Sequence, residues 1–248
     1  MKKLFDNNSQ LTDKSYWDSK YLNYQYKPQK MYFRDLIFKH IPNGKGKKCI
    51  EIGCYPGEKL LFFTKKLGYI PYGLDFTENL SDMNNFFIQN GINNLELINC
   101  DFETYQINDL FDLVCSFGFI EHFKNYEEIL QKHIELVKPG GYLMVTCPNF
   151  TNFQYRLHYL LDRENLLFHE LSAMDLQKWK YILIRNEMEI LYHDYYKTAG
   201  FWTADHEGNL ESILTKIIKY SFFGIDTLMT YPNKHISPNL VSISRKPF

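Results

Sequence analysis

The 248-residue sequence predicts an α/β fold built on a doubly wound, mostly parallel sheet of seven strands. Short apolar runs alternate with helix-length segments between residues 48 and 147, a rhythm typical of βαβ units whose helices cover both faces of a sheet. Two more strand-like runs lie at 187–196 and 240–244. No crossover helix directly precedes the last run, so this pair is compatible with antiparallel order.

Glycine and aspartate delimit the first elements. Gly53 and Asp75 end strand-like runs, while Gly68 and Gly91 stand where helical patterns stop, because glycine readily adopts the left-handed conformation of a helix C-cap. In chain order we expect a helix over 31–40, a strand over 48–52, a helix over 58–67, a strand over 70–74, a helix over 80–90 and a strand over 95–99.

The later elements follow the same rules until Pro148 breaks the rhythm. Pro139 and two glycines separate a helix from the strand that follows it. In chain order we expect a strand over 110–116, a helix over 126–137, a strand over 142–147, a mostly helical segment over 150–185, a strand over 187–196, a helix over 209–222 and a strand over 240–244.

Composition and charge argue against several classes of protein. The net charge of −1 disfavours a nucleic-acid partner held by phosphate contacts, which calls for a basic excess. No run approaches the roughly 18 apolar residues of a membrane span, and no secretory hydrophobic region follows the first lysines. The five cysteines show no paired spacing, so we expect reduced thiols in a cytoplasmic protein.

Open parallel sheets bind ligands at the carboxyl ends of their strands, where the polar and glycine residues of this sequence gather. Gly53 and Gly57 flank a turn into a helix, whose N-terminus suits a carboxylate or phosphate. Asp75 ends the next strand, where a carboxylate accepts both hydroxyls of a ribose; a helix N-cap is the alternative. Asp101 ends the third strand and can accept an adenine amino group, with loop capping as its alternative.

Taken in order, these segments resemble the class I S-adenosylmethionine-dependent methyltransferases. The matching segments are 50–57 (IEIGCYPG) for the glycine-rich first motif, Leu74 and Asp75 for the acidic second motif, 111–116 with Ile120-Glu121-His122-Phe123 for the fourth strand and its Glu-His loop, and 136–141 (LVKPGG) for the turn before the fifth strand. The resemblance covers about residues 45–150. Tyr55 departs from the pattern, because the family usually has a glycine there.

The resemblance implies a Rossmann-like methyltransferase fold with a helical substrate-side insertion after strand five, S-adenosyl-L-methionine as cofactor and S-adenosyl-L-homocysteine as product. It implies a cofactor site of Glu51, Gly53, Cys54 and Gly57 at the amino-acid end, Asp75 at the ribose, Phe76, Asp101 and Phe102 at the adenine, and Phe117 and Gly118 near the reactive centre. It divides the chain into an N-terminal helical cover (1–44), a cofactor-binding core (45–150) and a substrate-side insertion with the last two strands (151–248), all within one domain.

His122 is the candidate catalytic base. It follows the fourth strand, where the acceptor arrives in such folds, and imidazole titrates near neutrality. The alternative is that Glu121 and His122 only pin their loop. We expect no metal, because Pro148 and Asn149 follow the fifth strand without a carboxylate; a ligand such as Asp162 from the later segment stays open.

The predicted function is methyl transfer to a small-molecule acceptor by a cytoplasmic bacterial enzyme. We favour O-methylation of a saccharide or nucleotide-activated precursor of surface glycan or capsule; Tyr155, Tyr159 and Trp179 suit a sugar face. A quinone or lipid precursor is the alternative acceptor, supported by the segments 157–161 (LHYLL) and 166–168 (LLF). A non-catalytic cofactor-binding partner protein is the alternative from another class. The sequence leaves a homodimer open.

Overall fold

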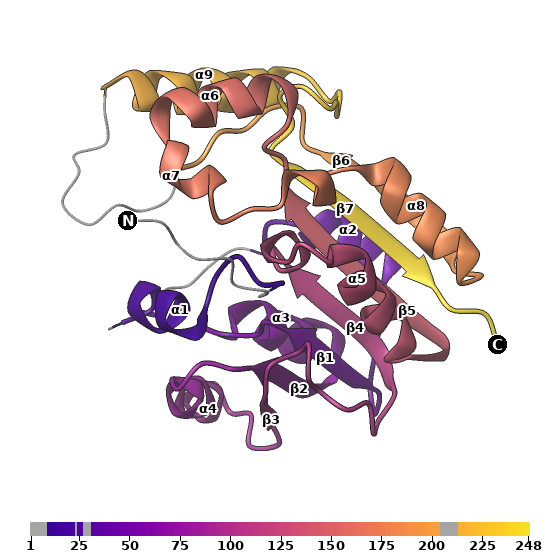
Figure 1. The fold of residues 1–248 in the computed structure, drawn as a ribbon. Coiled ribbons are helices and arrows are strands. Elements are labelled where there is room, and N and C mark those ends of the chain that lie inside the picture. The colour runs from indigo at the N-terminus through magenta and orange to yellow at the C-terminus, as the bar shows by residue number, and fades with distance from the viewer. Residues whose placement is uncertain (1–8, 23, 27–30, 204–212) are drawn as a thin grey trace.

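The computed structural model describes residues 9–22, 24–26, 31–203 and 213–248, which fold around a seven-stranded sheet of order β3-β2-β1-β4-β5-β7-β6 (Figure 1). The strands are β1 (Lys48–Ile52), β2 (Ile70–Asp75), β3 (Glu96–Asn99), β4 (Phe111–Phe117), β5 (Val137–Pro148), β6 (Glu189–Tyr196) and β7 (Asn239–Arg245). The first five pair in parallel, and β7 runs antiparallel to both of its neighbours. This topology confirms the predicted fold class and the antiparallel pair.

Helices cover both faces of the sheet. The helices are α1 (Lys14–Lys20), α2 (Arg34–His40), α3 (Glu58–Leu67), α4 (Leu80–Gln89), α5 (Tyr126–Glu135), α6 (Asn152–Leu161), α7 (Arg163–Leu166), α8 (Leu176–Arg185) and α9 (Ile213–Leu228), with short 3-10 helices η1 (Ile120–His122) and η2 (Leu171–Ala173). Side chains alternate along β4: Val114 packs in one core with α5 and α8, whereas Leu113 and Cys115 pack in another with α2, α3 and α4. Successive side chains of a strand therefore point into two buried layers, one on each face of the sheet.

A third, smaller apolar cluster joins α6 to α9 above the sheet. Phe201 and Phe222 are buried there against Leu157 and Leu161 of α6. Figure 1 shows these two helices side by side, beyond the carboxyl ends of the parallel strands, where they form a roof. Within the described residues, no helix combines the length and the apolar character needed to cross a bilayer.

Several boundaries differ from the sequence prediction. β5 begins at Val137 rather than at 142, because Val137 already pairs with Phe111 before a register shift in the ladder. The segment 150–185 is mostly helical, as predicted, and it is divided into three α-helices and η2. α9 runs to Leu228 instead of ending at 222, and the predicted start at 209 lies outside the described residues. The proposed section boundaries at 44 and 150 stay a prediction, because β6 and β7 join the same sheet as the core.

Candidate active site

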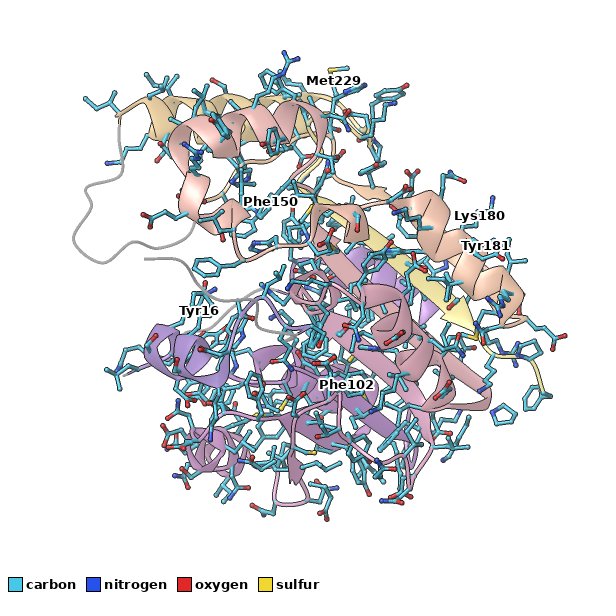
Figure 2. The ribbon with its side chains drawn as sticks, viewed as in Figure 1. Tyr16, Phe102, Phe150, Lys180, Tyr181 and Met229 are labelled. Atoms are coloured by element: carbon cyan, nitrogen blue, oxygen red, sulfur yellow. The ribbon has the colours of Figure 1, made fainter. Side chains whose placement is uncertain are left out.

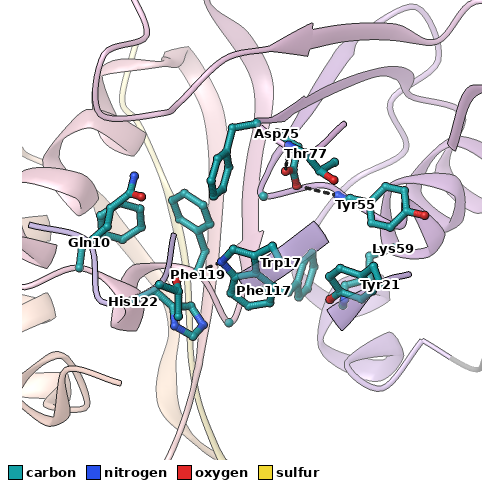
Figure 3. Close-up of a pocket in the computed structure, with 15 residues that line it drawn as sticks. Gln10, Trp17, Tyr21, Tyr55, Lys59, Asp75, Thr77, Phe117, Phe119 and His122 are labelled. Atoms are coloured by element: carbon teal, nitrogen blue, oxygen red, sulfur yellow. Dashed lines mark hydrogen bonds between the residues drawn. The ribbon is translucent and has the colours of Figure 1, made fainter. Parts of the chain in front are cut away.

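A pocket lies at the carboxyl ends of β1, β2 and β4, under a cover made by α1 and the residues before it (Figure 3). Its volume is about 80 Å³. Its lining residues are Gln10, Thr12, Trp17, Tyr21, Gly53, Tyr55, Lys59, Asp75, Phe76, Thr77, Phe117, Gly118, Phe119, His122 and Phe123. The structure thus brings together Gly53, Asp75, Phe76, Phe117, Gly118 and His122 from the predicted set. We call this the cofactor pocket.

Gly53 forms the turn that leads from β1 into the pocket wall. Its φ is +68°, and a Cβ there would lie 2.5 Å from the ring of Phe119. Backbone conformation and space therefore both require glycine at this position. Gly57 has a φ of +95° at the N-cap of α3, and a Cβ there would meet Met83 of α4 at 2.8 Å. Gly57 thus permits close packing of two helices and does not line the pocket.

Asp75, the last residue of β2, holds the loop around the pocket. Its carboxylate oxygens accept hydrogen bonds from the backbone N–H groups of Tyr55 and Thr77, each at 3.0 Å. Burial raises the pKa of Asp75, and these backbone donors oppose that rise. A carboxylate has about four acceptor positions, so the group keeps acceptor capacity for a ligand beside its backbone donors. The loop-capping role and a ligand-binding role are therefore compatible.

Tyr55 occupies the position where a glycine was expected. Its backbone N–H donates to Asp75, while its ring lies edge-on to Tyr21 and Tyr24, with centroids 5.2 and 6.4 Å away. The tyrosine side chain therefore connects the glycine-rich turn to the N-terminal cover and forms part of the pocket wall.

Asp101 is engaged by the N-terminal segment. Both of its carboxylate oxygens accept from the Gln10 side-chain amide, at 2.9 and 3.0 Å. A protein amide thus takes the position predicted for an adenine amino group. Phe102 lies in the apolar core (Figure 2), 2% exposed, with its ring against Phe119 and His133. Phe102 does not line the pocket, whereas Phe119, whose ring packs against it, does.

Glu51 and Cys54 support the turn from beneath. Glu51 is 2% exposed, and burial raises the pKa of its carboxyl to about 8, against the opposing effects of the Lys59 charge and the backbone N–H of Leu60. The Cys54 sulfur lies 3.7 Å from the Met83 sulfur, and burial raises the pKa of its thiol. Neither side chain lines the cofactor pocket.

His122 stands where the cofactor pocket meets a second pocket of about 280 Å³. The lining residues of this acceptor pocket, as we name it, are Trp17, Lys20, Tyr21, Tyr32, Phe33, Lys59, Phe117, Gly118, Glu121, His122, Thr146, Pro148, Asn165, His169, Trp202 and Asn239. The residues that line both pockets are Trp17, Tyr21, Lys59, Phe117, Gly118 and His122, so a group transferred between ligands of the two pockets would pass beside them.

The His122 ring is fixed in orientation. Its Nδ1 lies 2.8 Å from the carbonyl oxygen of Phe168, and Trp17 lies edge-on at 5.0 Å. A carbonyl only accepts, so Nδ1 carries the hydrogen and Nε2 is the nitrogen with a lone pair when the ring is neutral. Burial and the neighbouring His169 lower the pKa of His122 well below its usual value, which keeps the ring neutral near pH 7.

Glu121 is buried next to His122. The carboxyl is 1% exposed, and burial raises its pKa to about 8, with a hydrogen bond involving Cys147 acting in the opposite direction. Its Oε2 atom has no hydrogen-bond partner. The Glu-His loop is also tied to the roof, since the Glu170 N–H donates to the Glu121 carbonyl at 2.6 Å. Glu121 and His122 can therefore hold their loop in place and also line the pocket.

Several aromatic and polar residues that seemed suited to the acceptor lie elsewhere. Trp179 was expected to suit a sugar face; this was wrong, because its ring is fully buried and donates to the Ala173 carbonyl from the core. Tyr155 and Tyr159 lie partly exposed on α6 and do not line the acceptor pocket. Trp202 and Asn239 do line it. No local sequence pattern marks them, since tertiary folding alone carries them to the carboxyl ends of the strands.

The chain matches the family model of a methyltransferase domain over residues 22–197. It is 30% identical over 97 residues to a malonyl-[acyl-carrier protein] O-methyltransferase of Calditerrivibrio nitroreducens, covering 39% of this chain and 36% of that protein. It is 28% identical over 117 residues to the (S)-coclaurine N-methyltransferase of Papaver somniferum, covering 45% and 32%. The chain therefore spans about a third of the length of these curated relatives.

Solved structures share the fold at low identity. A phosphoethanolamine N-methyltransferase 2 of Haemonchus contortus superposes with a TM-score of 0.64 at 15% identity, over 94% of this chain and 56% of that chain. A geranyl diphosphate C-methyltransferase of Streptomyces coelicolor A3(2) superposes with a TM-score of 0.59 at 8% identity, over 86% and 78%. At this level of identity, the matches show that the chain shares the fold of these proteins and nothing further.

Proposed function

The chain belongs to the class I S-adenosylmethionine-dependent methyltransferases, and we propose that it transfers the cofactor's methyl group to an oxygen atom of a small acceptor. The observation that carries this proposal is the meeting of two pockets. One pocket holds the glycine turn and Asp75, the other is lined by aromatic and polar side chains, and both are bordered by Phe117, Gly118 and His122.

The proposed cofactor contacts follow from the pocket. Asp75 binds the ribose hydroxyls through its remaining acceptor capacity, Phe76 lies beside the adenine, and Gly53 leaves room for the amino-acid end. Glu51, Cys54 and Gly57 support these groups from beneath. Asp101 can bind the adenine amino group only after Gln10 releases it.

The cover must move for the cofactor to enter. The cofactor pocket has about 80 Å³, whereas sites for ligands of this size hold about 300–1,000 Å³. Trp17, Tyr21 and Gln10 fill the missing space from the N-terminal side. Opening and closing of residues 9–22 therefore belongs to the proposed cycle, and closure would keep water from the sulfonium.

The reaction depends mainly on aligning the acceptor oxygen with the methyl group of the cofactor. An acceptor oxygen attacks the methyl carbon, the carbon–sulfur bond breaks with its electron pair remaining on sulfur, and S-adenosyl-L-homocysteine results. A hydroxyl acceptor also loses its proton, and Nε2 of His122 is the proposed recipient because Nδ1 is committed to the Phe168 carbonyl. Holding the two reactants in line supplies much of the rate enhancement.

The acceptor pocket favours a polar molecule with flat apolar faces. Trp17, Tyr32 and Trp202 offer ring faces, and Asn165 and Asn239 offer amides beside them. Lys20 and Lys59 add positive charge that suits a phosphate. We therefore propose a saccharide or a nucleotide-activated precursor, such as those of bacterial surface glycans, as the acceptor.

A lipid or quinone precursor is the second candidate. The observation in its favour is the apolar surface of the roof, where Leu160 of α6 and Ile213 and Phe223 of α9 are 71–79% exposed. Such a surface would suit contact with an acceptor that carries a long apolar chain.

The test combines calorimetry and turnover. The full chain is titrated with S-adenosyl-L-homocysteine and then assayed for methyl transfer to sugars, sugar nucleotides and quinone precursors. His122→Ala should lower turnover by about 100-fold with unchanged cofactor affinity, as expected for loss of a general base. The exposed His235 provides the control variant His235→Ala, which should keep full activity. Cofactor binding without turnover on any acceptor would support the non-catalytic alternative, and no binding would reject the proposal.

A further inference from the structure

Two histidines and a glutamate from separate parts of the chain converge in the wall of the acceptor pocket. Glu121 and His122 belong to η1, and His169 follows α7; one ligand atom from each lies within 4.8 Å of the others. Glu121 and His122 are buried, and His169 is partly buried. We infer that these three side chains bind a divalent transition-metal ion at the edge of the acceptor pocket.

Hydrogen bonding orients both imidazoles for such a site. Nδ1 of His122 lies 2.8 Å from the Phe168 carbonyl oxygen, and Nδ1 of His169 lies 2.7 Å from the Asn165 carbonyl oxygen. Each Nδ1 therefore donates a hydrogen, which leaves Nε2 of each neutral ring with a free lone pair. Metal-binding histidines typically donate their other ring N–H to a carbonyl or carboxylate in this way.

The third ligand is an unsatisfied carboxyl group. Oε2 of Glu121 is buried without a hydrogen-bond partner. Burying such an oxygen costs free energy unless a donor or cation compensates it. The Cys147 thiol neighbours this carboxyl, but Oε2 itself has no hydrogen-bond partner among the described residues, so a cation shared with the two imidazoles would satisfy it.

The donor set selects the class of ion. Two imidazoles and one carboxylate suit Zn²⁺, Fe²⁺ or Co²⁺ better than Mg²⁺ or Ca²⁺, which prefer oxygen ligands. Bonds of about 2.0–2.2 Å would place the ligand atoms about 3.4 Å apart, so the side chains must draw together on binding. The hydrogen bond from the Glu170 N–H to the Glu121 carbonyl already holds the two segments together.

Lys20 is the cationic side chain that opposes a metal here. It lines the same pocket, with its ammonium 4.7 Å from the centre of the Trp17 ring. Because Lys20 belongs to the cover, its distance from the cluster changes when the cover moves. We expect the cation to bind more tightly when α1 is displaced.

A bound ion would change how the acceptor is activated. Three protein ligands leave coordination positions for an acceptor oxygen, as in catalytic rather than structural sites. The ion would lower the pKa of a bound hydroxyl, whose proton leaves to solvent before the oxygen attacks the methyl carbon. This consequence rests on the proposed function and refines the role of His122, whose Nε2 would then be a ligand. The binding itself does not depend on methyl transfer.

The experiment uses the full chain after treatment with a chelator. Zn²⁺ is titrated by calorimetry, and Co²⁺ is titrated by its visible absorption, which reports coordination number and ligand type. We expect one equivalent per chain. Glu121→Gln and His169→Ala should each weaken binding at least 10-fold, and the exposed control His235→Ala should leave it unchanged.

S-adenosyl-L-homocysteine binding and circular dichroism report whether each variant is folded. Equal Zn²⁺ affinity in wild type and His169→Ala, or the absence of saturable binding in wild type, would overturn the inference. Turnover separates the two roles of His122: a metal-activated reaction is lost in His169→Ala, whereas direct proton transfer to His122 survives it. Zn²⁺ binding without S-adenosyl-L-homocysteine binding would reject the proposed function and leave the metal site standing.

Discussion

Replacement of Asp75 by alanine tests the central contact of the proposed cofactor site. The carboxylate accepts backbone hydrogen bonds from Tyr55 and Thr77 and keeps acceptor capacity for a ligand. Asp75→Ala therefore removes two different things. It takes away the acceptors proposed for the ribose, and it leaves two loop N–H groups without their partner.

The two losses have separate magnitudes. Losing the ribose contacts should cost about 1–3 kcal/mol of binding free energy, which corresponds to about a 5- to 150-fold rise in the dissociation constant for S-adenosyl-L-homocysteine. Leaving two buried N–H groups unsatisfied costs about 1–3 kcal/mol each. Because the pocket admits water at this point, we expect the lower end of that range, about 2–3 kcal/mol in the free energy of unfolding.

Calorimetric titration measures the first loss and urea unfolding measures the second. Asp112→Ala is a matched control. Asp112 likewise caps a backbone N–H, that of Lys48 at 2.9 Å, but it lies at the opposite end of the sheet, beside the first residue of β1. The control should lose stability and keep its cofactor affinity. If Asp75→Ala binds S-adenosyl-L-homocysteine as tightly as wild type does, Asp75 does not hold the ribose.

Two further outcomes follow from the geometry. Burial raises the pKa of Glu51 to about 8 in the folded protein, whereas the unfolded chain releases this proton from about pH 4.5 upward. The protonated carboxyl therefore contributes to the free energy of unfolding at low pH, and this contribution is lost as the pH rises through 8. Glu51→Gln should therefore raise the melting temperature relative to wild type at pH 9 more than at pH 5; an equal effect at both pH values would contradict the raised pKa. Asp18 accepts from the Thr77 hydroxyl at 2.6 Å and from the Glu78 N–H at 3.2 Å, which fastens α1 to the loop after β2. Asp18→Ala removes these hydrogen bonds, which should destabilise the closed position of α1 by about 1 kcal/mol and speed release of S-adenosyl-L-homocysteine about 5- to 10-fold. Stopped-flow tryptophan fluorescence measures this rate. An unchanged release rate would show that α1 does not retain the product.

Local chemistry predicted most of the core correctly. Strand and helix limits over 48–117 agree with the structure to within a residue or two, because glycine and aspartate at these turns have few conformational alternatives. β5 was predicted too short, since its first residues pair with Phe111 and pairing partners are not visible in one segment. The helical segment after Pro148 was recognised only in outline, because its breaks depend on contacts with the roof.

The candidate site was predictable only in part. Gly53 and Asp75, which line the pocket, could be singled out because turn chemistry and strand ends constrain them. The engagement of Asp101 by Gln10 was missed, because these residues are 91 positions apart and only the path of the N-terminal segment brings them together. His169 was one of several histidines in the second half of the chain, and no local pattern set it apart from His158 or His193. Trp179 shows the converse error, since an aromatic residue on an amphipathic helix more often fills a core than faces a ligand.

Two residues of η1 accept backbone hydrogen bonds, one from a segment before η1 in the chain and one from a segment after it. The Leu11 N–H donates to the carbonyl of His122, and the Glu170 N–H donates to that of Glu121. An engineer who grafted a new roof onto this scaffold would therefore have to keep residues 165–170 of the original chain. A graft that began after Glu170 would retain the native placement of the imidazole, and one that began at Pro148 would leave that placement to the donor sequence.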